Sequence, residues 1–162
     1  MSSGWLKCLM YMALLGVLAT PAGRLIAKAR LDPDRFPYKS LPFEADGKFY
    51  EKLGIRRWKD LLPDMSRVLT RTLPEKKVSL RDDGQRMEAL IHETCVAECV
   101  HGILCVLGLG MLAIWPGPGG AVVTAAYILL GNLPFMLIQR YNRPRLRRLL
   151  EKKQRRPKPP AI

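Results

Sequence analysis

The chain has 162 residues and a formal net charge of +13, with 48% hydrophobic and 25% charged residues. A soluble protein this basic would suggest nucleic-acid binding, but the sequence contains no zinc-finger spacing and no RNA-recognition motif. The apolar residues gather in two regions, Trp5–Ile26 and Cys99–Ile138, and the cations lie beside them. Because cations next to apolar spans orient membrane proteins and attract anionic lipid headgroups, we expect a membrane protein and no nucleic-acid partner.

Residues 1–27 are predicted to form an N-terminal transmembrane or signal-like helix. The uncharged core, Cys8–Gly23, has about 16 residues and is short for a bilayer that needs about 20, but Lys7 and Arg24 can extend to the interface. One cation, an apolar run and the small residues around Ala19–Ala22 also fit a signal peptide. The sequence favours an uncleaved anchor, and either interpretation puts the start of the chain on the outer side.

Residues 28–90 are predicted to form a cytoplasmic or interfacial loop region. After a turn-rich start, the apolar residues from Phe49 to Leu62 recur at roughly helical spacing, with cations next to them, and Pro63 ends the pattern. The stripe consists of Phe49, Leu53, Trp58, Leu61 and Leu62, and the cations are Arg56, Arg57 and Lys59. This pattern is typical of a helix lying in the membrane interface with Trp at headgroup level. A helix packed on the rest of the loop explains it equally well.

Residues 91–146 are predicted to form a transmembrane helical hairpin. Two apolar segments, Cys99–Trp115 and Ala121–Ile138, flank a Pro/Gly turn at Pro116–Gly120, and the whole stretch contains no Lys, Arg, Asp or Glu. Backbone polar groups in lipid must be satisfied within each helix, which favours a hairpin that crosses the membrane twice. A buried hairpin in a soluble protein is the weaker alternative.

Charge predicts the orientation of this all-α membrane protein. Residues 27–90 carry fifteen Lys and Arg, residues 140–162 carry ten, and the turn carries none. The positive-inside rule therefore places the loop and the C-terminal tail in the cytoplasm and the N-terminus outside, with three spans. The basic tail, residues 147–162, is explained by this topology and by lipid attraction.

The helix that enters the second span carries candidate catalytic residues. At 100° per residue, Glu93, Thr94, Glu98 and His101 lie within about 140° of arc, at or inside the bilayer surface. An ionisable side chain there is a functional hypothesis by default. Glu98 and His101 are three residues apart and can touch, and a carboxylate beside an imidazole supports its action as a general base. The alternative is a frayed helix end in headgroup water.

The cytoplasmic end of the third span is predicted to lie beside this face. Arginines alternate there with Tyr and Asn in Gln139–Leu146, and Arg143 and Arg145 could hold phosphate bidentately. The candidate substrate-binding residues are Arg140, Tyr141, Asn142, Arg143 and Arg145, together with Trp58 and Lys59 of the interfacial region. We expect no metal, because one Glu-x-x-His without a second copy, and Cys95 with Cys99, supply too few ligands.

Four motifs give the chain a family resemblance. Phe43–Phe49, Arg57–Lys59, Glu93–His101 and Gln139–Leu146 occur in this order. With them the sequence resembles the glycosyl-4,4′-diaponeurosporenoate acyltransferase family, bacterial membrane proteins linked to staphyloxanthin synthesis, over about residues 40–150. The resemblance implies transfer of a fatty acyl group to a sugar hydroxyl of a glycosylated carotenoid or related glycolipid. It also implies a bacterial cell membrane, an acyl donor and possible carotenoid-pathway partner enzymes.

Within that activity, physical reasoning assigns roles to the candidates. His101 deprotonates the sugar hydroxyl, Glu98 orients the imidazole and Glu93 contacts sugar hydroxyls. Arg140, Arg143 and Arg145 hold the phosphates of an acyl-CoA-type donor, a co-substrate in a protein with no bound cofactor. The sequence has no Gly-x-Ser-x-Gly elbow, which argues against a covalent acyl-enzyme. The competing function is a non-catalytic protein that binds anionic lipid or a partner enzyme through its basic face.

Overall fold

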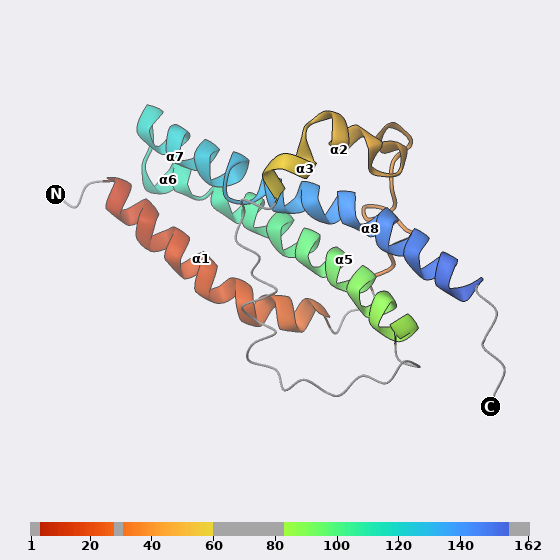
Figure 1. The fold of residues 1–162 in the computed structure, drawn as a ribbon. Coiled ribbons are helices and arrows are strands. Elements are labelled where there is room, and N and C mark those ends of the chain that lie inside the picture. Colours follow the sequence, from red (N-terminus) through yellow and green to blue (C-terminus); the bar gives the residue numbers. More distant parts are fainter. Residues whose placement is uncertain (1–3, 28–30, 60–82, 156–162) are drawn as a thin grey trace.

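A computed structural model describes residues 4–27, 31–59 and 83–155, and these are helical apart from short connections, with no strand among them (Figure 1). The order of elements is α1 (Gly4–Ala27), the 3-10 helix η1 (Pro42–Gly47), α2 (Lys48–Lys52), α3 (Ile55–Trp58), α5 (Asp83–Gly108), α6 (Met111–Ile114), α7 (Pro118–Leu129) and α8 (Leu133–Gln154). The all-α fold class predicted from the sequence is confirmed.

Three stretches are long and apolar enough to cross a membrane: Gly4–Ala27, Gly84–Ile114 and Pro118–Gln154. In their most apolar windows only 6%, 28% and 11% of the residues are buried inside the fold. The apolar side chains therefore face mainly outward, as they do where lipid is the solvent. This arrangement matches the predicted N-terminal span and C-terminal hairpin.

The predicted Pro/Gly turn joins α6 to α7. Gly117 has a φ of 107°, in the region that favours glycine. A Cβ on Gly120 would lie 1.8 Å from the carbonyl oxygen of Trp115, so only glycine fits at this close approach. The chain reverses here, and Figure 1 shows α5 and α8 side by side along most of their length, which agrees with their extensive contacts.

Helix α1 packs antiparallel to α5. Cys8 and Leu15 are buried, and the Tyr11 hydroxyl donates a 2.9 Å hydrogen bond to the Leu107 carbonyl, where α5 ends. Gly4 lies against the Trp115 side chain beside the hairpin turn. The start of α1 and the turn are therefore at one end of the helix group, and α8 ends at the other (Figure 1).

Helix α8 is longer than the predicted hairpin arm. It continues past residue 146 to Gln154, with Pro144 inside it, so the first part of the predicted tail is helical. Leu, Arg, Glu and Lys dominate that stretch, and all are good helix formers. Its N-terminal boundary is also new, because Gly131 and Asn132 interrupt the third span between α7 and α8.

The segment 31–59 is not one continuous interfacial helix. Left-handed glycines at Gly47 (φ 95°) and Gly54 (φ 70°) divide it into η1, α2 and α3. The buried side chains Tyr50 and Ile55 pack with Tyr141 of α8, while Trp58 covers the edge of this small core. Leu61 and Leu62, which belong to the predicted stripe, and Pro63, which was predicted to end it, lie outside the described residues.

Candidate functional site

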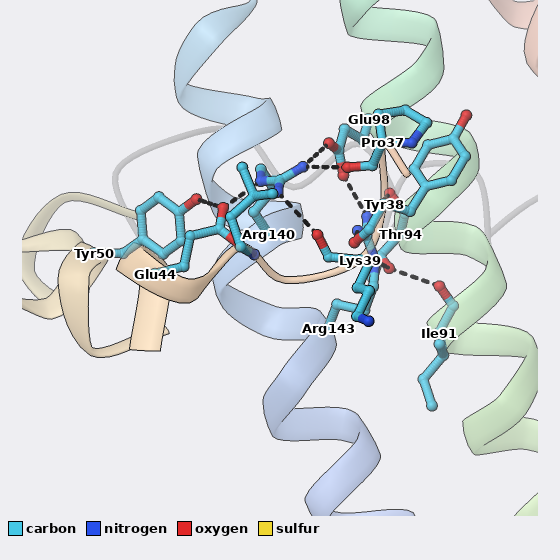
Figure 2. Close-up of polar contacts among 11 residues, drawn as sticks. Pro37, Tyr38, Lys39, Glu44, Tyr50, Ile91, Thr94, Glu98, Arg140 and Arg143 are labelled. Carbon is cyan, nitrogen blue, oxygen red and sulfur yellow. Dashed lines mark hydrogen bonds and ion pairs between the residues drawn. The ribbon is translucent and has the colours of Figure 1, made fainter. Parts of the chain in front are cut away.

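A buried polar cluster joins segment 31–59 to α5 and α8 (Figure 2). At its centre, the Arg140 guanidinium pairs with two carboxylates: Nε lies 2.5 Å from Glu44 Oε1 and Nη1 lies 2.6 Å from Glu98 Oε1. Arg140 also donates to the carbonyl oxygens of Pro37, at 2.8 Å, and Lys39, at 3.3 Å. These contacts occupy much of the donor capacity of one guanidinium.

Arg143, one turn further along α8, is 3% exposed and equally engaged. Its Nη2 lies 2.5 Å from Glu98 Oε2, so the two oxygens of Glu98 are shared between two arginines. The Arg143 Nε donates to Thr94 Oγ1 at 2.8 Å, Nη1 donates to the Tyr38 carbonyl at 2.5 Å, and Nη2 also reaches the Thr94 carbonyl at 3.2 Å. The cluster thus contains two carboxylates and two guanidiniums, and its formal charges cancel.

Glu44 is 2% exposed and receives three donors. Burial by itself raises the pKa of this carboxyl, but hydrogen bonds from Arg140, Tyr50 and the Leu41 N–H outweigh burial and hold the pKa below its usual range. Burial and the bond to Glu44 raise the pKa of Tyr50, which stays a protonated donor. Glu44 is therefore ionised at neutral pH and can hold Arg140 in place.

His101 lies one turn beyond Glu98 on α5, outside this cluster. Its Nδ1 is 3.0 Å from Asn132 Oδ1, at the break between α7 and α8. The Asn132 Nδ2 donates to the Tyr127 carbonyl at 3.0 Å, which leaves Oδ1 as the acceptor and makes His101 Nδ1 the donor. When the ring is neutral, this network selects the tautomer whose Nε2 carries the lone pair. The ring also stacks on Phe135, with centroids 4.9 Å apart and planes 7° from parallel.

The structure changes one predicted pairing. The imidazole of His101 is held by Asn132, where the sequence predicted Glu98, and Glu98 is bound by the two arginines. Charge-assisted bonds to guanidinium are stronger than a bond to neutral imidazole. The helical spacing of α5 placed Glu98 and His101 close together, but it carried no information on partners that come from α8.

The other predicted site residues are dispersed. Glu93 is exposed on α5, and Asn142 is half-buried on α8. Tyr141 is buried against Tyr50 and Ile55, and Arg145 donates to its hydroxyl and, at 3.3 Å, to Glu51. Trp58 is half-buried, with Nε1 donating to the Leu53 carbonyl at 3.2 Å, and Lys59 is half-buried next to it.

Four residues of the site were not among the predicted candidates: Glu44, Tyr38, Tyr50 and Asn132. Glu44 stands inside the Phe43–Phe49 motif, but it was not singled out there. Asn132 follows Gly131 in an otherwise apolar run, and a polar side chain within a span is a signal for an interhelical hydrogen bond. The described residues hold no group of three or more His, Cys, Asp or Glu that could bind a metal ion.

A groove of about 340 Å³ runs between the loop around residue 40 and α8, next to the cluster. Its cationic lining consists of Lys39, Arg143, Arg147 and Arg148, and its acidic lining of Asp34, Asp46 and Glu151. Two of these acids are paired, since Arg147 contacts Asp34 and Arg148 lies 3.2 Å from Asp46.

Comparisons with known proteins give a consistent result. The family described as glycosyl-4,4'-diaponeurosporenoate acyltransferase matches residues 34–152. Proteins of that name from Staphylococcus aureus strains bovine RF122 / ET3-1 and MRSA252 are each 30% identical over 151 residues, covering 92% of this chain and 89% of theirs. The protein of strain USA300 is 29% identical over the same coverage. No solved structure matches the chain significantly.

Proposed function

Because the chain belongs to the glycosyl-4,4'-diaponeurosporenoate acyltransferase family and is thus an acyltransferase, we propose that it esterifies a sugar hydroxyl of a glycosylated carotenoid, or of a related glycolipid, with a fatty acyl group. The relatives are named for a glycosylated carotenoid acid, which supports this class of acceptor. Three apolar helices suit a reaction in which acceptor and donor are both lipids.

The observation that carries the mechanism is the hydrogen bond between His101 and Asn132. It leaves Nε2 of the imidazole as a base, and stacking on Phe135 restricts the ring. In the proposed reaction Nε2 takes the proton of the sugar hydroxyl as its oxygen attacks the acyl carbonyl. The proton then passes to the leaving group of the donor. General-base catalysis of this kind contributes about 10²–10⁴-fold in rate.

The remaining candidates take supporting roles. Glu98 acts as a positioning residue, because it holds Arg140 and Arg143 and so joins α5 to α8. Glu93 is a candidate for sugar contact, since its exposed carboxylate lies about 12 Å from His101 along the α5 axis.

For an acyl-CoA-type donor, the cations most open to phosphate are exposed ones rather than Arg140 or Arg143. The side chain of Arg145 is 46% exposed and that of Arg148 is 54% exposed. Both lie on α8 beyond the buried cluster. Arg148 lines the groove described above, and Lys39 lines the same groove. Arginine is suited to phosphate because its planar guanidinium can donate two parallel hydrogen bonds.

The Staphylococcus aureus relatives support a bacterial cell-membrane location. The charge distribution supports an orientation with the start of α1 and the hairpin turn outside and the end of α8 in the cytoplasm. The packing of α1 supports an anchor that is retained. The Tyr11 hydroxyl donates a hydrogen bond to the Leu107 carbonyl at the end of α5, and Cys8 is fully buried. Removal of α1 would therefore uncover the surface against which Cys8 packs and leave the Leu107 carbonyl without this donor.

The test uses the full-length protein in proteoliposomes with a glycosylated carotenoid and an acyl-CoA. Mass spectrometry should detect the acceptor with one added acyl group, and Asn132→Leu should lower the rate at least about tenfold by releasing the imidazole. His101→Ala should abolish the product, while His92→Ala on the same helix retains it. Formation of the ester by His101→Ala at the wild-type rate would refute the assignment, and transfer to no glycolipid at all would refute the proposed activity.

A further inference from the structure

An apolar ridge stands on the outer side of η1 and α2. Phe43, Phe49 and Leu53 are 60%, 37% and 50% exposed. The rings of Phe43 and Phe49 contact each other edge to face, with centroids 5.5 Å apart. Leu53, the C-cap residue of α2, follows Phe49 by four residues, about one helical turn. These side chains therefore form one continuous surface rather than isolated exposed residues.

A row of cations runs along this ridge. Lys48 and Lys52 are exposed and have the same four-residue spacing, each one position before an apolar residue of the ridge. The exposed side chain of Arg57 extends the row onto α3. Its neighbour Arg56 is also exposed, but it is paired with Glu51 at 2.6 Å. Apolar and cationic rows side by side are typical of segments that lie in the interface of an anionic membrane.

The opposite side of the same segment fixes its height relative to the membrane. Tyr50 and Ile55 pack on Tyr141, with Leu137 and Ile138 against this core. Leu137 and Ile138 are the last apolar residues of the third span before Arg140. Figure 1 shows α2 and α3 next to the first part of α8. The ridge is therefore placed where α8 passes from hydrocarbon to headgroups.

We propose that the ridge is a membrane-insertion surface. It is seated in the leaflet on the side of the membrane where α8 ends. Phe43, Phe49 and Leu53 enter the acyl boundary, and Lys48, Lys52 and Arg57 contact the phosphates of anionic lipids. The occupant is lipid because the surface is continuous with three outward-facing apolar helices and is flanked by cations. The two interpretations of this segment left open by the sequence then both apply, one to each side: Tyr50 and Ile55 pack on α8, and the ridge meets lipid.

This proposal is independent of the reaction and can be tested without substrate. The full chain carries photoreactive p-benzoylphenylalanine in place of Phe49 or, in a second variant, Phe43, in liposomes of phosphatidylglycerol and phosphatidylcholine. The control position is exposed Arg155, roughly 25 Å beyond Ile138 along α8. Illumination should give phospholipid adducts at position 49 or 43 at least tenfold more often than at position 155. Adduct levels equal to the control at both positions, or crosslinks mainly to a second copy of the chain, would overturn the proposal.

The cationic row is tested in the same system. Lys48→Gln combined with Lys52→Gln should lower the fraction of adducts formed on phosphatidylglycerol relative to phosphatidylcholine at position 49, because the anionic headgroups lose their attraction. Glu93→Gln, on α5 and outside the ridge, is the matched control. An unchanged ratio between the two lipids would overturn the anionic-lipid part of the proposal.

Discussion

Two carboxylates on α5 illustrate how strongly burial decides the role of a residue. Glu98 is 5% exposed and bound by Arg140 and Arg143, whereas Glu93 is exposed to solvent or headgroups. Breaking a buried ion pair from one side leaves charges without compensation and costs about 3–5 kcal/mol, much more than the loss of an exposed charge. The same substitution at the two positions should therefore have very different effects.

We predict that Glu98→Gln lowers the free energy of unfolding by about 3 kcal/mol or more, because Arg140 and Arg143 stay buried with less negative charge. Glu93→Gln should change it by less than about 0.5 kcal/mol. The measurement is denaturant unfolding in lipid–detergent micelles. Unfolding is monitored through the thiol labelling of Cys95, which is fully buried in the folded protein. Equal midpoints for the two variants would mean that the cluster does not stabilise the fold.

At the scale of elements, the turn between α6 and α7 depends on glycines around Trp115. Added Cβ atoms on Gly4 and Gly119 would each come within 2.4 Å of the Trp115 side chain, and one on Gly120 would meet the Trp115 backbone at 1.8 Å. The indole is thus enclosed by small residues from α1 and α7. This packing fastens α1 to the hairpin and determines how closely the two elements approach.

Gly120→Ala should destabilise the protein by about 1–3 kcal/mol or more, because the clash is with backbone atoms that cannot rotate away. Gly16→Ala is the matched control: it lies in the interior of α1 with open space at its Cβ, and alanine is the better helix former there. Thermal unfolding of the two variants in the same lipid mixture measures the difference. A Gly120→Ala variant as stable as Gly16→Ala would contradict the close packing around Trp115.

At the scale of the whole molecule, hydropathy and charge were sufficient to predict the three apolar helices and the hairpin turn, because these features depend on local composition. The partners in the polar site were not predictable in the same way. Glu44 and Arg140 are separated by 96 residues and His101 and Asn132 by 31, so helical periodicity within one element could not pair them. Gly54 also ended a helix that the apolar spacing alone had extended.

The whole arrangement places an imidazole one helical turn outside the charged cluster, on the side of the cluster that faces the hairpin turn. The cluster joins segment 31–59, α5 and α8 into one unit, and the imidazole faces the apolar zone beyond it. In this account the helices and the cluster position the substrates, and His101 is the group that moves the proton.

Chemical rescue of His101→Gly tests that claim most directly, because it separates the imidazole from the rest of the fold. Acyl transfer to the glycosylated carotenoid is measured with purified protein in proteoliposomes, with and without added imidazole. The account predicts a loss of about 10²–10⁴-fold and partial recovery with imidazole in the variant only. Wild-type rates for His101→Gly in the absence of imidazole would contradict it.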